Sequence, residues 1–185
     1  MTAREGKAKA LDGYLVACVR VADRKAFELL VERWDPKLRA HARRLLGDRE
    51  LAREAVQDAW VEIVRGLNSL RDDAAFHAWA YRIVSRRCAR VIAGAQRRRQ
   101  MAEALATEPA AAEAAPVDRA EPTDLERMRK AVRELPPEQR ATVALFYFEG
   151  LSVSETAIAM DIPAGTVKTR LMHARRKLRD TLEGD

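Results

Sequence analysis

The chain has 185 residues and carries 34 lysines and arginines against 28 aspartates and glutamates, which gives a formal net charge of +6 at pH 7. This length is enough for one or two small domains, and the basic balance favours a polyanionic partner. Walker, GxGxxG and GxSxG motifs are absent from the sequence, so we predict no enzymatic activity and no cofactor.

The composition predicts an all-α protein. Glycine is scarce, with eight residues, alternating strand patterns are absent, and alanine, leucine, arginine and glutamate dominate. Cys18 and Cys88 are far apart with no CxxC partner, and the three histidines (His41, His77, His173) lack metal-ligand spacing, so neither a redox pair nor a metal site is predicted. No segment resembles a signal peptide or a membrane span, so we expect a cytoplasmic protein without membrane insertion.

The first domain is predicted over residues 1–99. Its helices are expected at Leu11–Val21, Asp23–Leu46, Arg49–Arg65 and Phe76–Arg99. We expect Asp35-Pro36 to interrupt or kink the second of these helices, because proline removes a backbone donor. In the third helix one face is apolar and packs inward, while Gln57, Asp58 and Glu62 point elsewhere.

The fourth helix of this domain contains seven arginines and no acid. If the helix persists far enough, Arg86, Arg90 and Arg97 lie at about 40°, 80° and 60° from Arg82 on the helical wheel. Like charges on one face repel one another unless a polyanion is present, so this stripe suggests phosphate binding. Trp79 lies at the edge of the stripe, where its indole either packs against a neighbouring helix or stacks on an unpaired base.

A change of composition separates this domain from the rest of the chain. From Gln100 to Asp124 the sequence has three prolines, six acids and one arginine, and large apolar residues are nearly missing. We therefore predict an acidic, alanine- and proline-rich flexible linker over residues 100–122, with a brief helical start at Met101–Leu105.

The second domain is predicted over residues 123–185 and begins with two helices. Thr123 to Glu126 has the form of a capping box, and Pro136-Pro137 ends the first helix and opens the next. We expect Phe146 and Phe148 to fill the small core of this domain, and Gly150 to stop the second helix.

A short helix, a tight turn and a longer helix complete the second domain. Ser152 to Glu155 is another capping box, and Asp161-Ile162-Pro163 breaks the short helix. On the longer helix, one narrow wedge is apolar and consists of Val167, Leu171, Ala174 and Leu178. Its far side carries Thr169, Met172, His173 and Arg176, and its flanks carry Lys168, Arg170, Arg175 and Lys177. This is the pattern of a DNA-binding helix-turn-helix.

Three stretches together resemble a known family, the bacterial extracytoplasmic-function (ECF) sigma factors of the sigma-70 class. They are "ELAREAVQDAWVEIVRGL", "AFHAWAYRIVSRRCARVIAGAQRRR" and "LPPEQRATVALFYFEGLSVSETAIAMDIPAGTVKTRLMHARRKL", in this order. The resemblance implies a first domain equivalent to sigma region 2 and a second equivalent to sigma region 4. It also implies a non-catalytic subunit that binds core RNA polymerase, opens promoter DNA and leaves after initiation.

The resemblance also implies site residues and partners. Core polymerase would be bound through its β′ clamp helices, by Glu54, Gln57 and Asp58, and through its β flap. The −10 element would be captured by Trp79, Arg82, Arg86 and Arg90. The −35 element would be contacted by Lys168, Thr169, Met172, His173 and Arg176. An anti-sigma factor is a further expected partner.

The sequence departs from the family pattern at three positions. Arg53 stands where an acid is usual, Arg87 where an asparagine is common, and Asp161 where the turn usually has a glycine. Aspartate tolerates the left-handed conformation better than most residues, so we expect the turn to form.

Two other functions compete with this interpretation. One is a sigma-like adaptor that sequesters an anti-sigma protein without binding DNA, but such a protein needs neither the cationic helix nor the arginine stripe. The other is a helix-turn-helix regulator with an N-terminal dimerisation domain.

Overall fold

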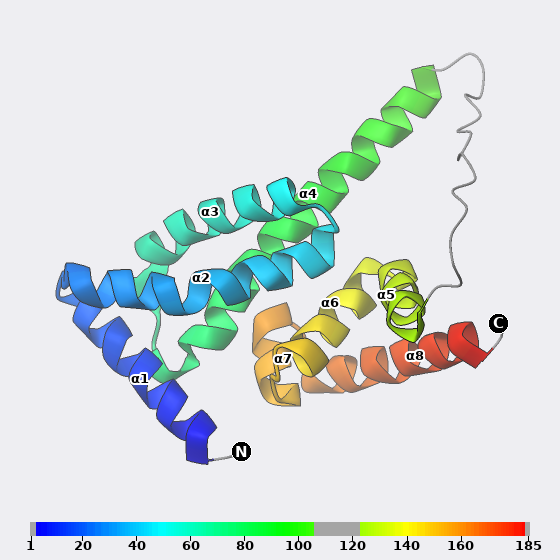
Figure 1. Ribbon diagram of the computed structural model, residues 1–185. Coiled ribbons are helices and arrows are strands. Elements are labelled where there is room, and N and C mark those ends of the chain that lie inside the picture. Colours follow the sequence, from blue (N-terminus) through cyan, green and yellow to red (C-terminus); the bar gives the residue numbers. More distant parts are fainter. Residues whose placement is uncertain (1–2, 106–122, 184–185) are drawn as a thin grey trace.

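The computed structural model describes residues 3–105 and 123–183, and these ranges are helical apart from short turns (Figure 1). The first domain consists of α1 (Ala3–Arg20), α2 (Arg24–Leu46), α3 (Arg49–Gly66), two 3-10 turns (Leu67–Ser69 and Asp73–Ala75) and α4 (Phe76–Leu105). The second consists of α5 (Asp124–Glu134), α6 (Pro137–Val143), a π-helical turn (Ala144–Phe148), α7 (Val153–Met160) and α8 (Ala164–Glu183). The predicted all-α class is thereby confirmed for the described residues. Most of the predicted linker lies outside them.

Local sequence signals account for most of the helix ends. Asp23 and Asp48 accept hydrogen bonds from the backbone N–H groups of Ala26 and Leu51, at 3.1 and 2.8 Å, and so begin α2 and α3. Gly47, with φ of 75°, ends α2 in the left-handed conformation that glycine adopts without strain. The predicted Gly150 stop is also present, with φ of 69°.

Of the two predicted effects of Asp35-Pro36, an interruption is wrong, because α2 continues through Pro36 without a break, and a kink stays a prediction. A proline inside a helix costs about 3 kcal/mol. The core supplies the compensation, since Trp34 and Leu38 lie on either side of Pro36 and are buried together with Leu30. Burial of each such side chain is worth about 1.5–3 kcal/mol.

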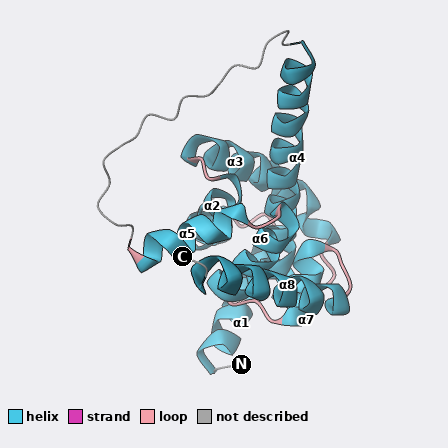
Figure 2. Ribbon diagram, turned by 90° about the vertical axis from the view of Figure 1, so that its right-hand side faces the viewer, coloured by secondary structure: helices cyan, strands magenta, loops and turns pink. Residues whose placement is uncertain are grey.

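One apolar core extends from the first domain into the second. Within the first domain it is formed by side chains of all four helices, among them Val16, Leu30, Val56 and Val84. The second domain adds Ala141, Ala144, Leu145, Leu151 and Ala159 to the same cluster. The two domains therefore pack against each other, and α7 lies beside the first half of α4 (Figures 1 and 2).

The prediction that Phe146 and Phe148 fill the core of the second domain is half correct. Phe146 packs against the smaller cluster formed by α5, α6 and α8, whereas Phe148 is 51% exposed. The π-helical turn inserts one extra residue per turn at this point, which rotates Phe148 away from the core. The Arg44 guanidinium lies 4.9 Å from the centre of its ring instead.

Trp79 is half-buried and packs closely against the end of α3. A Cβ atom placed on Gly66 would lie only 2.9 Å from Cζ2 of the Trp79 ring. Gly66→Ala is therefore expected to destabilise the protein by about 1–3 kcal/mol, since overpacking outweighs the 0.5–1 kcal/mol that alanine gains in a helix. Gly94→Ala is the matched control, because only the flexible Arg98 side chain lies within 4 Å of that position.

Thermal unfolding of the two variants measures this difference. Gly94→Ala should unfold at or above the temperature of the wild type, while Gly66→Ala should unfold several degrees below it. Equal transition temperatures for both variants would mean that Trp79 is not held against Gly66.

Candidate nucleic-acid and polymerase interfaces

The longest helix of the second domain, α8, is anchored by the predicted apolar wedge. Val167 and Ala174 are fully buried, Leu171 is 3% exposed, and Leu178 packs at the edge of the same cluster. Because these four side chains point inward, Lys168, Thr169, Met172 and Arg176 are exposed on the opposite side, and His173 is half-exposed.

The turn before α8 has the geometry that the sequence predicts. Asp161 adopts the left-handed conformation, with φ of 56° and ψ of 45°, although it is not glycine. Ser152 and Glu155 form both hydrogen bonds of the capping box at the start of α7. Ile162 N–H donates to the Ala157 carbonyl at 3.1 Å and closes the turn between the two helices. The arrangement is that of a helix-turn-helix.

The cations of α8 divide into two groups. Three have partners within their own domain: Arg170 pairs with Glu138 at 2.5 Å, Arg175 donates to the Tyr147 hydroxyl at 2.6 Å, and Lys177 donates to a backbone carbonyl of α5. Lys168, Arg176 and Arg179 have no hydrogen-bond or ion-pair partner among the described residues. These three cations are thus available for an external ligand.

The arginine stripe of α4 is paired more extensively than its sequence indicates. Glu62 of α3 accepts hydrogen bonds from both Arg86 and Arg87. Arg82 pairs with Asp161, in the turn of the second domain, at 2.6 Å. These charges therefore do not need a polyanion to offset their repulsion, contrary to the prediction, because acids from other helices partly neutralise them. Arg90 has no partner among the described residues.

The outer face of α3 is exposed and mixes carboxylates with aliphatic side chains. Glu54, Gln57 and Asp58 all lie on it, as the sequence predicts. Val61 and Val64 are 48% and 50% exposed on the same face. The Asp58 side chain is 69% exposed and lies 3.6 Å from the Arg87 guanidinium. Such a surface suits a helical protein partner with apolar and cationic side chains.

Glu149 joins the two domains from the end of the π-helical turn. Its side chain is 7% exposed, it accepts a hydrogen bond from the Tyr81 hydroxyl at 2.6 Å, and it pairs with Arg44. Burial raises the pKa of Glu149, although Tyr81 and Arg44 oppose this effect. Burial, followed by the Glu149 charge, raises the pKa of Tyr81 well above its usual value.

Glu155 forms a second contact between the domains. Besides capping α7, it pairs with Lys9 and lies 2.9 Å from His77 Nε2. Burial opposes its ionisation, but hydrogen bonds from Lys9, Ser152 and His77 lower the pKa of Glu155 to about 2. Acids of the second domain thus meet cations of the first at three places, Glu149, Glu155 and Asp161. These pairs could not be predicted from the sequence, because periodicity carries no information about partners far away in the chain.

His41 is completely buried next to this interface. Its Nε2 lies 2.9 Å from the Ser85 hydroxyl, and burial, followed by the Arg44 charge, lowers the pKa of His41 to about 3. Glu149 lies 3.8 Å from His41 Nδ1, but its carboxylate is already paired with Arg44, so the ring stays neutral.

The neutral His41 ring predicts a pH dependence of stability. In the unfolded chain the histidine binds a proton near pH 6.5, so stability is complete above that pH and falls as the pH drops toward 3. Between pH 7.5 and 5.5 this contribution amounts to about 1.4 kcal/mol. Urea unfolding of the wild type and of His41→Gln at both pH values should show the extra loss in the wild type alone. Both proteins retain Glu149, so equal losses would contradict a neutral buried His41.

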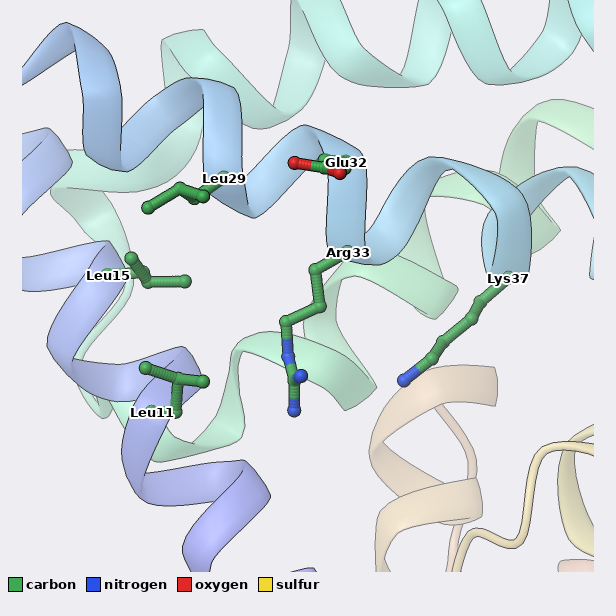
Figure 3. Close-up of a pocket in the computed structure, with 6 residues that line it drawn as sticks. All are labelled: Leu11, Leu15, Leu29, Glu32, Arg33 and Lys37. Atoms are coloured by element: carbon green, nitrogen blue, oxygen red, sulfur yellow. The ribbon is translucent and has the colours of Figure 1, made fainter.

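A cavity of about 490 Å³ opens between α1 and α2 (Figure 3). Leucines 11, 15 and 29 line one part of it, while Arg33 and Lys37 lie toward the other. None of the predicted site residues lines this cavity. Among the described residues, no group of histidine, cysteine, aspartate and glutamate side chains could hold a metal ion. No helix there is long and apolar enough to span a membrane.

Comparison with known proteins identifies the family. Residues 30–98 match the family model for Sigma-70 region 2, and residues 125–178 match that for Sigma-70, region 4. Over 176 residues the chain is 32% identical to the ECF RNA polymerase sigma-E factor of Escherichia coli strain K12, covering 90% of this chain and 92% of that protein. The chain belongs to the ECF sigma factors. It is therefore an RNA polymerase subunit that directs the enzyme to promoter DNA.

Other comparisons agree with this assignment. The sigma factor is 30% identical over 185 residues to the RNA polymerase sigma-H factor of Pseudomonas aeruginosa, covering 93% of this chain and 94% of that protein. Its fold is similar to that of RpoE of Bartonella quintana in complex with the anti-sigma factor NepR, with a TM-score of 0.68, 25% identity and coverage of 87% and 99%. CnrH, solved with the cytosolic domain of CnrY, has a TM-score of 0.71 at 24% identity, with coverage of 95% and 99%.

The region 2 match also decides against one alternative function. A helix-turn-helix regulator was expected to carry a dimerisation domain at its N-terminus, whereas this sigma factor carries region 2 there. Sigma factors are DNA-recognition subunits rather than catalysts, in agreement with the absence of catalytic motifs from the sequence.

Proposed function

We propose that this ECF sigma factor contacts the −35 element through the exposed side of α8, with Lys168, Thr169, Met172, His173 and Arg176 as the contacting residues. The observation that supports this most directly is the division of α8 into a buried apolar wedge and an exposed side with three unpaired cations, Lys168, Arg176 and Arg179. Lysine can donate to guanine acceptors in the major groove, and methionine can pack on a thymine methyl group. The other three cations of α8, Arg170, Arg175 and Lys177, have partners within the domain.

The −10 element would be held by the first half of α4. Trp79, Arg82, Arg86 and Arg90 follow one another along one side of α4, next to the end of α3 at Trp79 and next to the turn of the second domain at Arg82. For Arg82 and Arg86 to bind phosphates, their present partners Asp161 and Glu62 must be exchanged for DNA. Both pairs are partly exposed, so this exchange costs little. Trp79 would stack a base through the part of its ring that does not pack on Gly66.

Polymerase binding is assigned to the outer face of α3, through Glu54, Gln57 and Asp58, with the β flap as a second contact for region 4. The clamp helices of β′ would cover the exposed valines of this face, which are otherwise in contact with water. Residues 1–99, 100–122 and 123–185 would act as the polymerase- and −10-binding domain, the linker and the −35-binding domain. The protein would act in the cytoplasm, without catalysis of its own.

The packing of the two domains has a consequence for promoter binding. By their numbering, the −35 and −10 elements are centred roughly 25 base pairs apart, which is about 85 Å of B-form DNA at 3.4 Å per base pair. In the structure the helix-turn-helix touches the −10 helix directly, at Asp161 and Arg82. The domains must therefore separate before they can bind both elements at once. An anti-sigma factor, such as the one bound to the similar fold of RpoE, would act by holding the closed form.

Run-off transcription tests this function. Purified core polymerase is supplied with a genomic library, with and without the protein, and transcript starts are sequenced. Start sites that share −10 and −35 sequences and depend on the added protein are expected. Binding to an anti-sigma factor without any new start site would favour the adaptor function instead.

A further inference from the structure

The fourth helix continues far beyond the domain to which it belongs. Its last fully buried residue is Cys88, yet the helix runs without interruption to Leu105. The two ribbon views show its C-terminal half projecting away from every other helix (Figures 1 and 2). The brief helical start predicted at Met101–Leu105 is thus part of α4. Because the helix persists beyond Arg97, this residue lies on the arginine stripe as the sequence predicts.

This projecting half is a strongly basic surface. From Ala89 to Met101 it carries Arg90 and the consecutive arginines 97, 98 and 99, and it carries no acid. Residues 96–104 are all exposed. Arg90, Arg98 and Arg99 have no hydrogen-bond or ion-pair partner among the described residues, and Arg97 donates only to a backbone carbonyl of its own helix, at 3.4 Å. In contrast with Arg86, no acid of a neighbouring helix pairs with these arginines in the part of the chain that the structure describes.

The spacing of the arginines matches a DNA backbone. Arg90 and Arg97 lie about 20° apart on the helical wheel and about 10 Å apart along the helix axis. Phosphates on one strand of B-form DNA recur every 3.4 Å along the duplex axis, so these two side chains span about three base pairs. Arg98 is adjacent and long enough to reach the same backbone.

The position along α4 indicates which part of the promoter is within reach. Arg97 lies eighteen residues after Trp79, which corresponds to about 27 Å along the helix or roughly eight base pairs. Beyond Leu105 the chain leads to the domain that would contact the −35 element. Once the domains have separated, the linker that starts after Leu105 leads from this end of α4 to the second domain, so the projecting half would lie over double-stranded DNA between the −10 and −35 elements.

We propose that the C-terminal half of α4 is an additional DNA-binding site, in which Arg97 and Arg98 contact the phosphate backbone of the duplex between the two promoter elements. The site would recognise no sequence, since it offers backbone contacts only. It rests on the proposed function, because its placement depends on α4 and α8 binding the −10 and −35 elements. It would add affinity and fix the register of the duplex between them.

The test uses holoenzyme reconstituted with core polymerase and two fork-junction promoter fragments. One fragment keeps its duplex through the −35 element, and the other ends directly upstream of the −10 element. Arg97→Gln/Arg98→Gln is compared with the wild type and with Arg24→Gln/Lys25→Gln. The control pair removes the same charge from exposed adjacent positions at the start of α2, where Arg24 has only a solvent-exposed partner, Glu28.

The site predicts a change in salt dependence on the long fragment alone. Each phosphate contact contributes about 0.9 to the steepness with which log affinity falls with log salt concentration. The loss of two contacts should therefore reduce the steepness of this slope by about 1.8. The affinity advantage of the wild type over Arg97→Gln/Arg98→Gln should therefore shrink about tenfold between 50 and 200 mM salt. The control variant should follow the wild type, and the short fragment should bind all three proteins alike.

Three results would overturn this site. Equal salt slopes for the wild type and Arg97→Gln/Arg98→Gln on the long fragment would mean that these arginines contact only water. A defect that persists on the short fragment would place them on the −10 strand, and failure to assemble holoenzyme would place them on polymerase. If wild-type holoenzyme does not distinguish promoter from non-promoter fragments at all, the proposed function itself fails.

Discussion

The variant Leu171→Asp is expected to lose the folded second domain. Leu171 is 3% exposed and lies between Val167 and Ala174 in the wedge that attaches α8 to α5 and α6. The substitution removes an apolar side chain worth about 2–5 kcal/mol and places a carboxylate in the same site without a partner. Small domains are stable by only about 5–15 kcal/mol, so little of the folded population should remain.

Circular dichroism and limited proteolysis measure this loss. Loss of helical signal should be accompanied by rapid cleavage within residues 123–185. Met172→Asp is the control, since Met172 is the next residue on the same helix but is 57% exposed, and it should unfold like the wild type. A Leu171→Asp protein that resists protease as the wild type does would show that α8 is not packed through this wedge.

The variant Asp58→Arg is expected to abolish co-purification with core polymerase and to leave the fold unchanged. Reversal of a charge at the centre of an interface typically costs about 2 kcal/mol or more, which corresponds to roughly 30-fold weaker binding. The fold should tolerate the change, because Asp58 is 69% exposed and its contact with Arg87, at 3.6 Å, is worth less than about 1 kcal/mol.

A matched control separates this effect from a general change of charge. Glu28 of α2 is also an exposed acid in an ion pair with an arginine, but it lies outside the outer face of α3. Glu28→Arg should bind core polymerase as the wild type does. Wild-type affinity in Asp58→Arg would show that the clamp helices bind elsewhere.

The parts of the fold that follow from local rules could be predicted from the sequence. The capping boxes at Thr123 and Ser152, the left-handed turn at Asp161 and the buried wedge of α8 are all confirmed. Each depends on side chains within a few residues of one another, so sequence spacing determines the geometry. The inward faces of α2 and α3 follow from the same periodicity.

What could not be predicted depends on distant partners. The continuity of α2 through Pro36 depends on the core around Trp34 and Leu38, and the exposure of Phe148 depends on a π-helical turn that no local signal indicates. Periodicity showed that Arg82 faces outward, but it could not show that Asp161 would lie 2.6 Å away. The contact between the two domains is missed for the same reason.

The most direct test of promoter recognition by α8 uses a DNA library in which the −35 element is randomised. Holoenzyme containing either the wild-type protein or Lys168→Ala selects its preferred sequences from this library, and the two sets are compared. Lys168 is exposed and has no partner among the described residues, so its replacement should leave the fold intact. A lost base contact costs about 1–3 kcal/mol, so Lys168→Ala should bind more weakly and lose selectivity at one or two −35 positions. Arg175→Ala should instead leave the preferred sequence unchanged, because Arg175 is held by the Tyr147 hydroxyl and adds only its positive charge to the attraction of DNA. If Lys168→Ala retains both the preferred sequence and its affinity, α8 does not recognise the −35 element, and the adaptor function becomes the better explanation.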